Sequence, residues 1–203
     1  MARSQDDDRV EVLEHSRPYQ GFFSMDLYRL RHRTFAGGWT ETLSREVFER
    51  GHAAAVVLYD PARDQVVLIE QFRIGAYTAG LEPWLLEAVA GIIEPGEAAE
   101  AVVIRESMEE AGCEVTALEP IGRYLMSPGG CSETIALYCG RVEASGAGGL
   151  YGLTEEGEDI RAVALPWSEV ETRLNAGEIL SAHTVICLQW LTAHREELME
   201  RWK

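Results

Sequence analysis

A well-bounded helix near the middle of the chain constrains the fold more than any other feature. Pro95-Gly96 is a turn pair, and the alanine-rich stretch after it favours a helix over residues 98–111. Gly112 suits the left-handed cap that ends such a helix. Strand-like runs lie on both sides of this segment, and mixed strands with a few helices imply a layered α/β or α+β fold.

Three carboxylates crowd one side of this helix. Glu106 and Glu110 are four residues apart, and Glu109 is three residues from Glu106. Like charges at this spacing destabilise a bare helix by roughly a few tenths of a kcal/mol per pair. Mg²⁺ is held by a few carboxylates together with substrate phosphates, and a cation removes the repulsion. The cluster therefore indicates a cation site, with a solvated acidic face as the alternative, and Arg105 is suited to pair with one of the acids.

The overall charge limits the partners. The 203 residues include 34 acidic and 18 basic side chains, a net charge of −16, which argues against binding nucleic acid because phosphate backbones need Lys and Arg. A phosphorylated substrate stays possible, because bound cations can invert the local sign of a site. The polar N-terminus is not a secretory signal, and no apolar run is long enough for a membrane span. We expect a cytoplasmic protein without a membrane partner, whose four cysteines are small buried hydrophobes.

The first fifty residues differ from the rest. Residues 25–33 alternate apolar and polar side chains as a half-buried strand does, Gly37-Gly38 reads as a hairpin turn, and residues 40–48 form the returning strand. Strands with so few apolar residues make a poor independent domain. They are therefore expected to lie against the main domain or a second copy of the chain. The predicted domains are residues 1–50 and 51–203.

The remaining elements follow from periodicity and turn residues. We expect a loop over residues 146–157, a helix opened by a Ser168-x-x-Glu171 capping box and ended near Gly177, and a last helix from Ser181 to about Trp202. His52 is expected to be a satisfied core histidine. Strands are expected over residues 52–58, 65–72, 118–126, 133–142 and 160–165.

The acidic segment resembles a known family. Read as G-x5-E-x7-R-E-U-x-E-E-x-G-U, with U a bulky apolar residue, it is similar to the Nudix box. Ser107 and Cys113 stand at the two U positions, for which we expect slightly looser packing and unchanged chemistry. The matching residues are Gly91, Glu97, Arg105, Glu106, Glu109, Glu110 and Gly112.

Outside the box, nearly the whole chain resembles the bacterial ADP-ribose diphosphatase branch of that family. Ser127-Pro128-Gly129-Gly130 places a proline fifteen residues after Cys113, a spacing associated with ADP-ribose hydrolysis in this family. Where many relatives have Leu-Pro-Ala-Gly, this chain has Ala88-Val89-Ala90-Gly91. Further segments resemble the branch at residues 45–46, 49–54, 70–73 and 155–160.

The resemblance implies a fold and a metal site. The fold is a Nudix α/β/α sandwich with a mixed sheet, plus a small N-terminal antiparallel β-sheet subdomain whose strands reach across a homodimer. The implied cofactor is Mg²⁺, with Mn²⁺ as a substitute and two or three ions per site. The implied ligands are Glu106, Glu109, Glu110, the Ala90 carbonyl and Glu158 of the late loop.

The resemblance also implies a reaction, the Mg²⁺-dependent hydrolysis of ADP-ribose to AMP and ribose 5-phosphate. Arg105 would fix the catalytic carboxylates, and Glu156 would take the proton from the attacking water, with Glu158 as the alternative base. Another nucleoside diphosphate sugar or dinucleotide is an alternative substrate. A catalytically inactive nucleotide sensor is a further alternative, although a pure binder has no need for so many repelling acids.

Substrate contacts are expected from both parts of the chain. Arg73 and Arg50 are candidates to pair with the diphosphate, because a guanidinium binds phosphate in a fork geometry. Phe22 would stack on adenine, with Arg45 of the other subunit on the opposite face of the base. The remaining candidates are Glu46 for the adenine edge, Glu133 for ribose hydroxyls, and Ser127 and Gly129 in the Ser-Pro-Gly-Gly loop.

Overall fold

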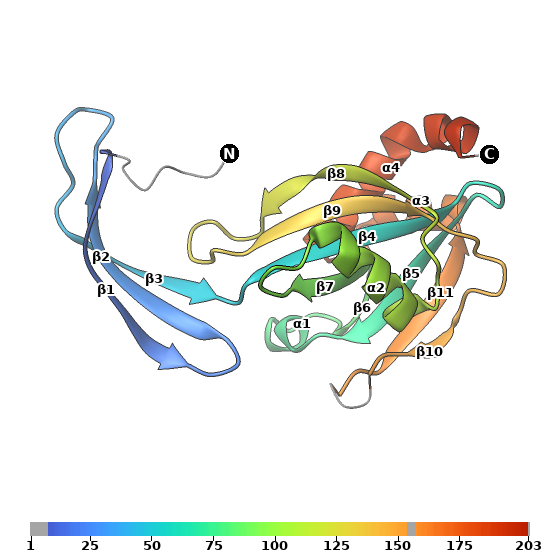
Figure 1. Cartoon of the computed structure of the whole chain (residues 1–203), viewed down its shortest axis with the longest axis horizontal. Helices are drawn as coiled ribbons and strands as arrows, with labels where there is room; N and C mark the ends of the chain where they lie inside the picture. Colours follow the sequence, from blue (N-terminus) through green and yellow to red (C-terminus); the bar gives the residue numbers. More distant parts are fainter. Residues whose placement is uncertain (1–7, 154–156, 203) are drawn as a thin grey trace. The chain divides into compact units, whose positions relative to one another are not determined.

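The computed structural model describes residues 8–153 and 157–202 (Figure 1). Within these ranges the chain divides into two compact units. One contains residues 8–51 together with Ser127–Glu133, and the other contains residues 52–126 and 134–202. The segment 127–133 therefore groups with the N-terminal strands, although it lies inside the range 51–203 expected to form the second domain.

The larger unit is built on an eight-stranded mixed sheet. Its strands follow the order β10-β11-β5-β4-β9-β8, with β6 paired to β5 and β7 paired to β4. β4 and β9 run parallel and the other neighbours run antiparallel. The strands are β4 (His52–Asp60), β5 (Gln65–Phe72), β6 (Trp84–Glu87), β7 (Val89–Ile93), β8 (Ala117–Leu125), β9 (Thr134–Arg141), β10 (Gly149–Tyr151) and β11 (Ile160–Pro166).

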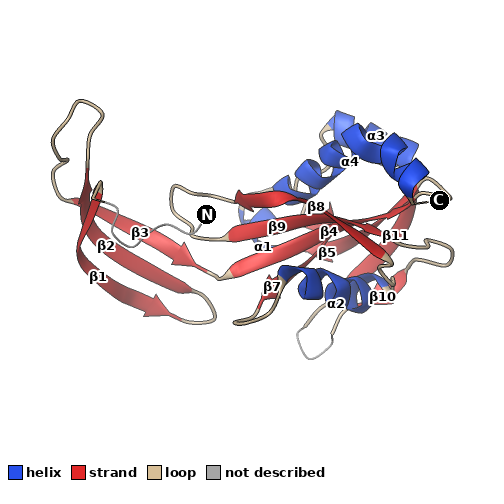
Figure 2. Ribbon diagram, turned by 45° about the horizontal axis from the view of Figure 1, so that its top comes forward, coloured by secondary structure: helices blue, strands red, loops and turns tan. Residues whose placement is uncertain are grey.

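Helices cover both faces of this sheet, as Figure 2 shows. The helix α2 (Ala99–Ala111) lies on one face, and α3 (Trp167–Ala176) and α4 (Ala182–Arg201) lie on the other. Strand β4 supplies both cores by alternation: Ala54, Val56 and Leu58 join the cluster under α2, while the residues between them join the cluster under α3 and α4. A strand buried on both faces is continuously apolar, as β4 is. The α/β/α sandwich with a mixed sheet is confirmed.

The smaller unit is a three-stranded antiparallel sheet of β1 (Val10–Gln20), β2 (Ser24–His32) and β3 (Leu43–Glu49). This confirms the predicted N-terminal sheet. No hydrophobic side chain among the described residues of this unit is buried. Asp26 is buried instead, and its carboxylate accepts hydrogen bonds from Arg17 Nε at 2.5 Å and from His15 Nε2 at 2.9 Å. The buried position in this sheet is thus taken by a charged side chain, Asp26, whose burial is tolerated because it is paired.

The predicted capping box at Ser168 is wrong. The N-cap residue of α3 is Pro166, two residues before Ser168, and this helix end carries no side-chain cap. The Trp167 amide donates instead to the Asp64 carbonyl at 2.9 Å, so the β4–β5 turn satisfies this helix end. Glu169 forms an ion pair with Arg173. The left-handed Gly177 at the end of the helix is confirmed.

Several other expectations need correction. The loop 146–157 contains the short strand β10, which pairs with β11. Ser181 is the N-cap residue of α4, but its hydroxyl lies against the His183 ring and does not cap the backbone. His52 is exposed, with its Nδ1 3.0 Å from the Thr134 hydroxyl. The sequence did not indicate α1 (Ile74–Thr78), β6 or β7.

The cysteines follow the expectation of buried thiols at three of four positions. All four cysteines are free; Cys113, Cys139 and Cys187 are buried and Cys131 is half-buried. In the described ranges, no helix combines the length and the apolar character needed to cross a bilayer.

Candidate active site

The helix α2 carries the acidic cluster and is anchored by its capped C-terminal end and by buried residues. Gly112 ends it with φ 62°, in the left-handed conformation that glycine adopts without strain, as predicted. Ser107, at the first departure from the apolar pattern, is fully buried, and its hydroxyl donates to the Val103 carbonyl at 2.6 Å. Cys113, at the second departure, is buried as well. Both positions are thus buried, and the slightly looser packing expected there stays a prediction.

Arg105 holds three acids of the segment. Its Nη1 donates to Glu106 Oε1 and to Glu109 Oε2, both at 2.8 Å. Its Nε lies 3.5 Å from Glu97 Oε1. This confirms that Arg105 pairs with acids. One guanidinium thus orients two carboxylates of α2 and one from the turn before it.

Burial and mutual repulsion perturb the two inner carboxylates. Glu110 is only 2% exposed, and burial, with the negative charges of Glu106 and Glu158, raises its pKa to about 8. The Ala90 amide, which donates to Glu110 Oε2 at 3.1 Å, and the charge of Arg73 oppose this shift. The pKa of Glu106 is raised by burial as well. Perturbed carboxylates of this kind mark functional sites more often than ordinary surfaces.

A glycine makes room for one of these carboxylates. A Cβ at Gly91 would lie 2.0 Å from Oε1 and 2.5 Å from Cγ of Glu106. Such a contact is far inside van der Waals distance, so the Glu106 side chain can keep its observed place only with glycine at position 91. The Glu106 side chain therefore fills the space that a side chain at position 91 would take.

The late loop brings a further acid to the same region. The Leu153 amide donates to Glu158 Oε2 at 3.1 Å, and the Gly152 amide donates to the Glu109 carbonyl at 3.3 Å. The loop is thus attached to the C-terminal half of α2, and the Glu158 charge raises the pKa of both Glu106 and Glu110. Glu156, predicted as the base, lies outside the described residues.

Arg73 completes the charged groups of the larger unit. Its Nε donates to Glu87 Oε2 at 2.7 Å, and its positive charge acts on Glu110. Ala90, Arg73, Arg105 and all the described acids predicted as ligands thus belong to one unit.

The other predicted substrate residues belong to the smaller unit. Phe22 is 88% exposed and meets Phe23 edge to face at 4.8 Å between centroids. Arg50 pairs with Glu133, Nε to Oε1 at 3.4 Å, and its guanidinium lies over the Phe23 ring. Arg45 and Glu46 are on β3, and Arg45 donates to the Ser44 carbonyl.

The Ser-Pro-Gly-Gly loop of this unit is a hydrogen-bonded turn. The Ser127 carbonyl accepts hydrogen bonds from the amides of Gly130 at 3.1 Å and Cys131 at 2.9 Å. The Gly130 carbonyl in turn accepts from the Phe48 amide at 2.8 Å, which attaches the loop to β3. Gly129 has open space around its Cα, with nothing within 4 Å of an added Cβ.

Sequence reasoning missed two residues that shape the site. Glu87 is 4% exposed and binds Arg73, but a single acid in an apolar run carries no recognisable pattern. The Tyr151 hydroxyl would lie 2.5 Å from a Cβ at Gly112, so this tyrosine packs on the cap of α2. Only pairing of the late loop with β11 places Tyr151 there, and that pairing is not local in the sequence.

The donor set fits a hard divalent cation in its chemistry. Carboxylate oxygens that raise one another's pKa are close enough to repel, and a cation among them would reverse that repulsion. In residues 8–153 and 157–202, no three His, Cys, Asp or Glu side chains are already gathered into a metal cage. The described residues of α2 and the late loop thus bring carboxylate oxygens to one region.

The Glu110 carboxyl gives a pH-dependent prediction. Its pKa in the folded protein, about 8, exceeds the ordinary value of 4.5. Its contribution to the free energy of unfolding is therefore fully present below pH 4.5 and is lost as the pH rises toward 8, because the unfolded chain ionises this group more readily. In EDTA, Glu110→Gln should therefore be more stable than the unaltered protein by about 3 kcal/mol at pH 7 and by less than about 1 kcal/mol at pH 5. Urea unfolding of both proteins between pH 5 and 8 measures this difference. A stability difference that does not change with pH would contradict the assignment.

Comparison with known proteins gives a consistent picture. A family model described as the NUDIX domain matches residues 49–182. The chain is 48% identical over 193 residues to the "ADP-ribose pyrophosphatase" of Escherichia coli strain K12, covering 95% of this chain and 92% of that protein. It is 40% identical over 197 residues to the protein of that name from Haemophilus influenzae, covering 96% and 91%.

More distant similarity extends to other named proteins. A "GDP-mannose pyrophosphatase" of E. coli is 36% identical over 156 residues, covering 74% of this chain and 78% of that protein. The solved structure titled "Crystal structure of ADP compounds hydrolase" has a TM-score of 0.69 at 20% identity and covers 94% of this chain and 98% of that one. At that identity the structural match bears on the fold alone.

Proposed function

The chain belongs to the Nudix family, and from that premise we propose that it hydrolyses the diphosphate bond of ADP-ribose to AMP and ribose 5-phosphate with bound Mg²⁺. It is a hydrolase of the family that acts on pyrophosphate bonds. One observation carries the proposal: Arg105 holds Glu106 and Glu109 beside the buried Glu110, in a chain that aligns over nearly its full length with ADP-ribose pyrophosphatases.

The acids of α2 and the late loop would hold the metal. We assign Glu106, Glu110, Glu158 and the Ala90 carbonyl as ligands, with Glu109 beside them and with two or three ions bound. Mn²⁺ has the same preference for oxygen ligands and could replace Mg²⁺. When bound, such cations neutralise the diphosphate oxygens and make water a better nucleophile.

The protein side chains supply position and a proton acceptor. Arg105 keeps Glu106 and Glu109 directed at the site, because it donates to both at 2.8 Å. We propose Glu156 as the base that accepts the proton of the attacking water, and Glu158 is the alternative. Arg73, whose positive charge acts on the buried Glu110, would bind the diphosphate.

The smaller unit is proposed to serve dimerisation and substrate binding. It has no buried hydrophobic side chain among its described residues, while Val12, Leu13 and Tyr19 of β1 are about half exposed or more. A sheet without a core of its own is suited to cover another surface. We therefore propose a homodimer with exchanged N-terminal strands.

Substrate contacts from this unit remain part of the proposal. Phe22 would stack on adenine opposite Arg45 of the other subunit, and Arg50 would pair with the diphosphate. Glu46 would bind the adenine edge and Glu133 the ribose hydroxyls, with Ser127 and Gly129 in the adjoining loop. The high exposure of Phe22 supports its role, because an aromatic ring free of a core can stack on a base.

A second substrate class follows from one relative, the GDP-mannose pyrophosphatase. The test is product release from ADP-ribose, GDP-mannose, NADH, diadenosine polyphosphates and coenzyme A at equal concentration with Mg²⁺. We expect kcat/KM for ADP-ribose to exceed the others by about tenfold or more, since a hydrogen-bonded site rejects analogues that leave its groups unpaired. A higher value for GDP-mannose would replace the proposed substrate.

A further inference from the structure

The buried carboxylate of Glu87 is the hydrogen-bond partner of Arg73. Glu87 is the last residue of β6, and it pairs in register with Ile69 of β5, one of the core residues under α2. Its side chain is 5% exposed, whereas that of Arg73 is 39% exposed. A buried carboxylate is unfavourable unless it is paired, and the Nε of Arg73 donates to it at 2.7 Å.

The backbone of Arg73 is fixed as well. Its amide donates to the Pro83 carbonyl at 2.7 Å, and its carbonyl accepts from the Tyr77 amide at 3.1 Å. Arg73 is also the residue at which β5 ends and α1 begins. With the backbone held on both sides, the remaining freedom of this residue is the rotation of its long side chain.

The contact with Glu87 uses one edge of the guanidinium. Nε points to the carboxylate, and among the described residues neither Nη nitrogen makes a hydrogen bond or an ion pair. The two Nη groups form the terminal edge, which can bind two oxygens of a phosphate at once. The guanidinium also lies close enough to Glu110 for its charge to act on that carboxyl.

We propose that Glu87 is a positioning residue for substrate binding: it holds Nε of Arg73 so that the terminal nitrogens face the diphosphate of the substrate. This inference rests on the proposed function and adds a residue to it. Pre-orientation matters because an unheld arginine side chain loses rotamer freedom when it binds an anion, and that loss weakens binding.

The pairing is difficult to explain by stability alone. A buried or half-buried ion pair contributes little net stability, and apolar side chains of similar volume can replace it without loss. Glu87 stands beside apolar strand neighbours that would accept such a replacement. Its charge is therefore better explained by the partner that it orients.

The test is a double-mutant cycle on the full chain with Mg²⁺ and ADP-ribose. Glu87→Leu is expected to raise KM about 10- to 30-fold, as expected for loss of a hydrogen bond to a charged group, while kcat changes less than about threefold. Glu87→Gln keeps an acceptor for Nε and should restore KM to within about threefold of the unaltered protein. In an Arg73→Leu background, Glu87→Leu should change KM less than about twofold, because the residue that it positions is gone.

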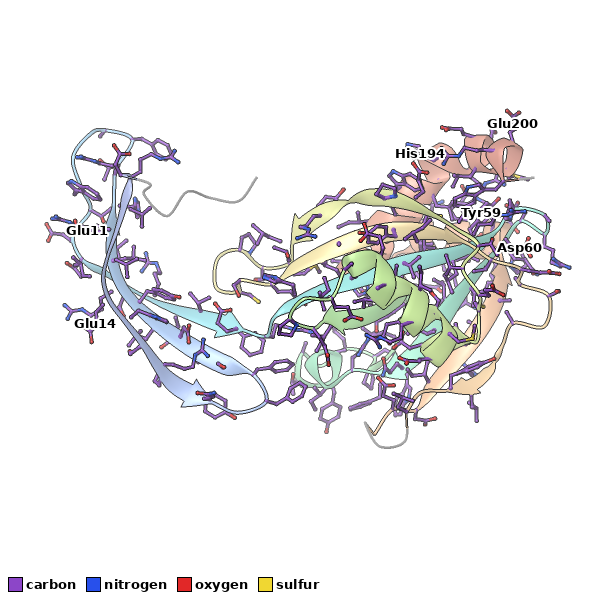
Figure 3. The ribbon with its side chains drawn as sticks, viewed as in Figure 1. Glu11, Glu14, Tyr59, Asp60, His194 and Glu200 are labelled. Atoms are coloured by element: carbon purple, nitrogen blue, oxygen red, sulfur yellow. The ribbon has the colours of Figure 1, made fainter. Side chains whose placement is uncertain are left out.

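A matched control separates positioning from stability. Asp60 is 1% exposed and accepts a hydrogen bond from Arg63 Nη1 at 3.0 Å, so it is another buried carboxylate that binds an arginine. Figure 3 shows Asp60 at the end of β4, beside the turn into β5, whereas Arg73 follows the far end of β5. Asp60→Asn should lower the unfolding temperature and leave KM unchanged.

Three outcomes decide the inference. If Glu87→Leu does not fold, Glu87→Asp takes its place, because the shorter side chain withdraws the carboxylate from Nε and should also raise KM. An unchanged KM in a folded variant overturns the inference, as does an equal rise in KM with and without Arg73. An unaltered protein that does not hydrolyse ADP-ribose overturns the proposed function first, and this inference with it.

Discussion

Glu106→Gln is expected to lower kcat on ADP-ribose by about 100- to 10 000-fold, the range set by losing several kcal/mol of stabilisation from a metal ligand. Gln keeps the size of the side chain and an acceptor for Arg105, which donates to Glu106 at 2.8 Å, so the fold should persist. Steady-state kinetics at saturating Mg²⁺, with a thermal unfolding curve for each protein, measure both quantities. Glu156→Gln should fall in the same range if it removes the base.

Glu100→Gln provides the control for this substitution. Glu100 lies in the first turn of the same helix and is exposed, so its replacement makes the same change in charge outside the acidic cluster. Its kcat should stay within about twofold of the unaltered protein, as is usual for surface substitutions. If folded Glu106→Gln and Glu156→Gln both retain near-normal turnover, the assignment of these acids is wrong.

Gly91→Ala is expected to lower kcat/KM about 100-fold without unfolding the protein. The added Cβ would lie 2.0 Å from Glu106 Oε1, so the carboxylate must move by an ångström or more. A displacement of about 1 Å at a catalytic group can cost about 100-fold in rate. The backbone of Gly91 tolerates alanine, because its φ is not in the left-handed region, and the nearest atoms to the added Cβ all belong to Glu106.

Gly75→Ala is the matched variant. Gly75 lies in α1, has nothing within 4 Å of an added Cβ, and also lacks a positive φ. Alanine should there leave kcat/KM unchanged and increase stability slightly, because it favours helix. Equal activity of Gly91→Ala and the unaltered protein would show that Glu106 does not need its observed place.

The helix α2 and its acids could be predicted because their signals are local. Pro95-Gly96 and Gly112 bound the helix, and the spacing of Glu106 and Glu110 puts both acids on one side of it. Strands β4 and β5 were predictable for a similar reason, since each is a continuous apolar run ended by turn residues.

The missed elements depend on contacts between distant residues. Strand β6 has only four residues, and it is defined by pairing with β5 across the intervening α1. The start of α3 is set by the Asp64 carbonyl, about a hundred residues earlier, so the local signal at Ser168 pointed to the wrong residue. The role proposed for Glu87 depends on its hydrogen bond with Arg73, and nothing in its neighbours along the chain indicates that pairing.

Product identification with and without magnesium tests the central claim most directly. The purified chain is incubated with ADP-ribose in excess Mg²⁺ and, in parallel, in EDTA, and the products are identified by mass. We predict AMP and ribose 5-phosphate in equal amounts with Mg²⁺ and intact ADP-ribose in EDTA. Intact ADP-ribose in both samples from a folded protein, or equal cleavage in EDTA, would contradict a hydrolase whose carboxylates act through bound cations.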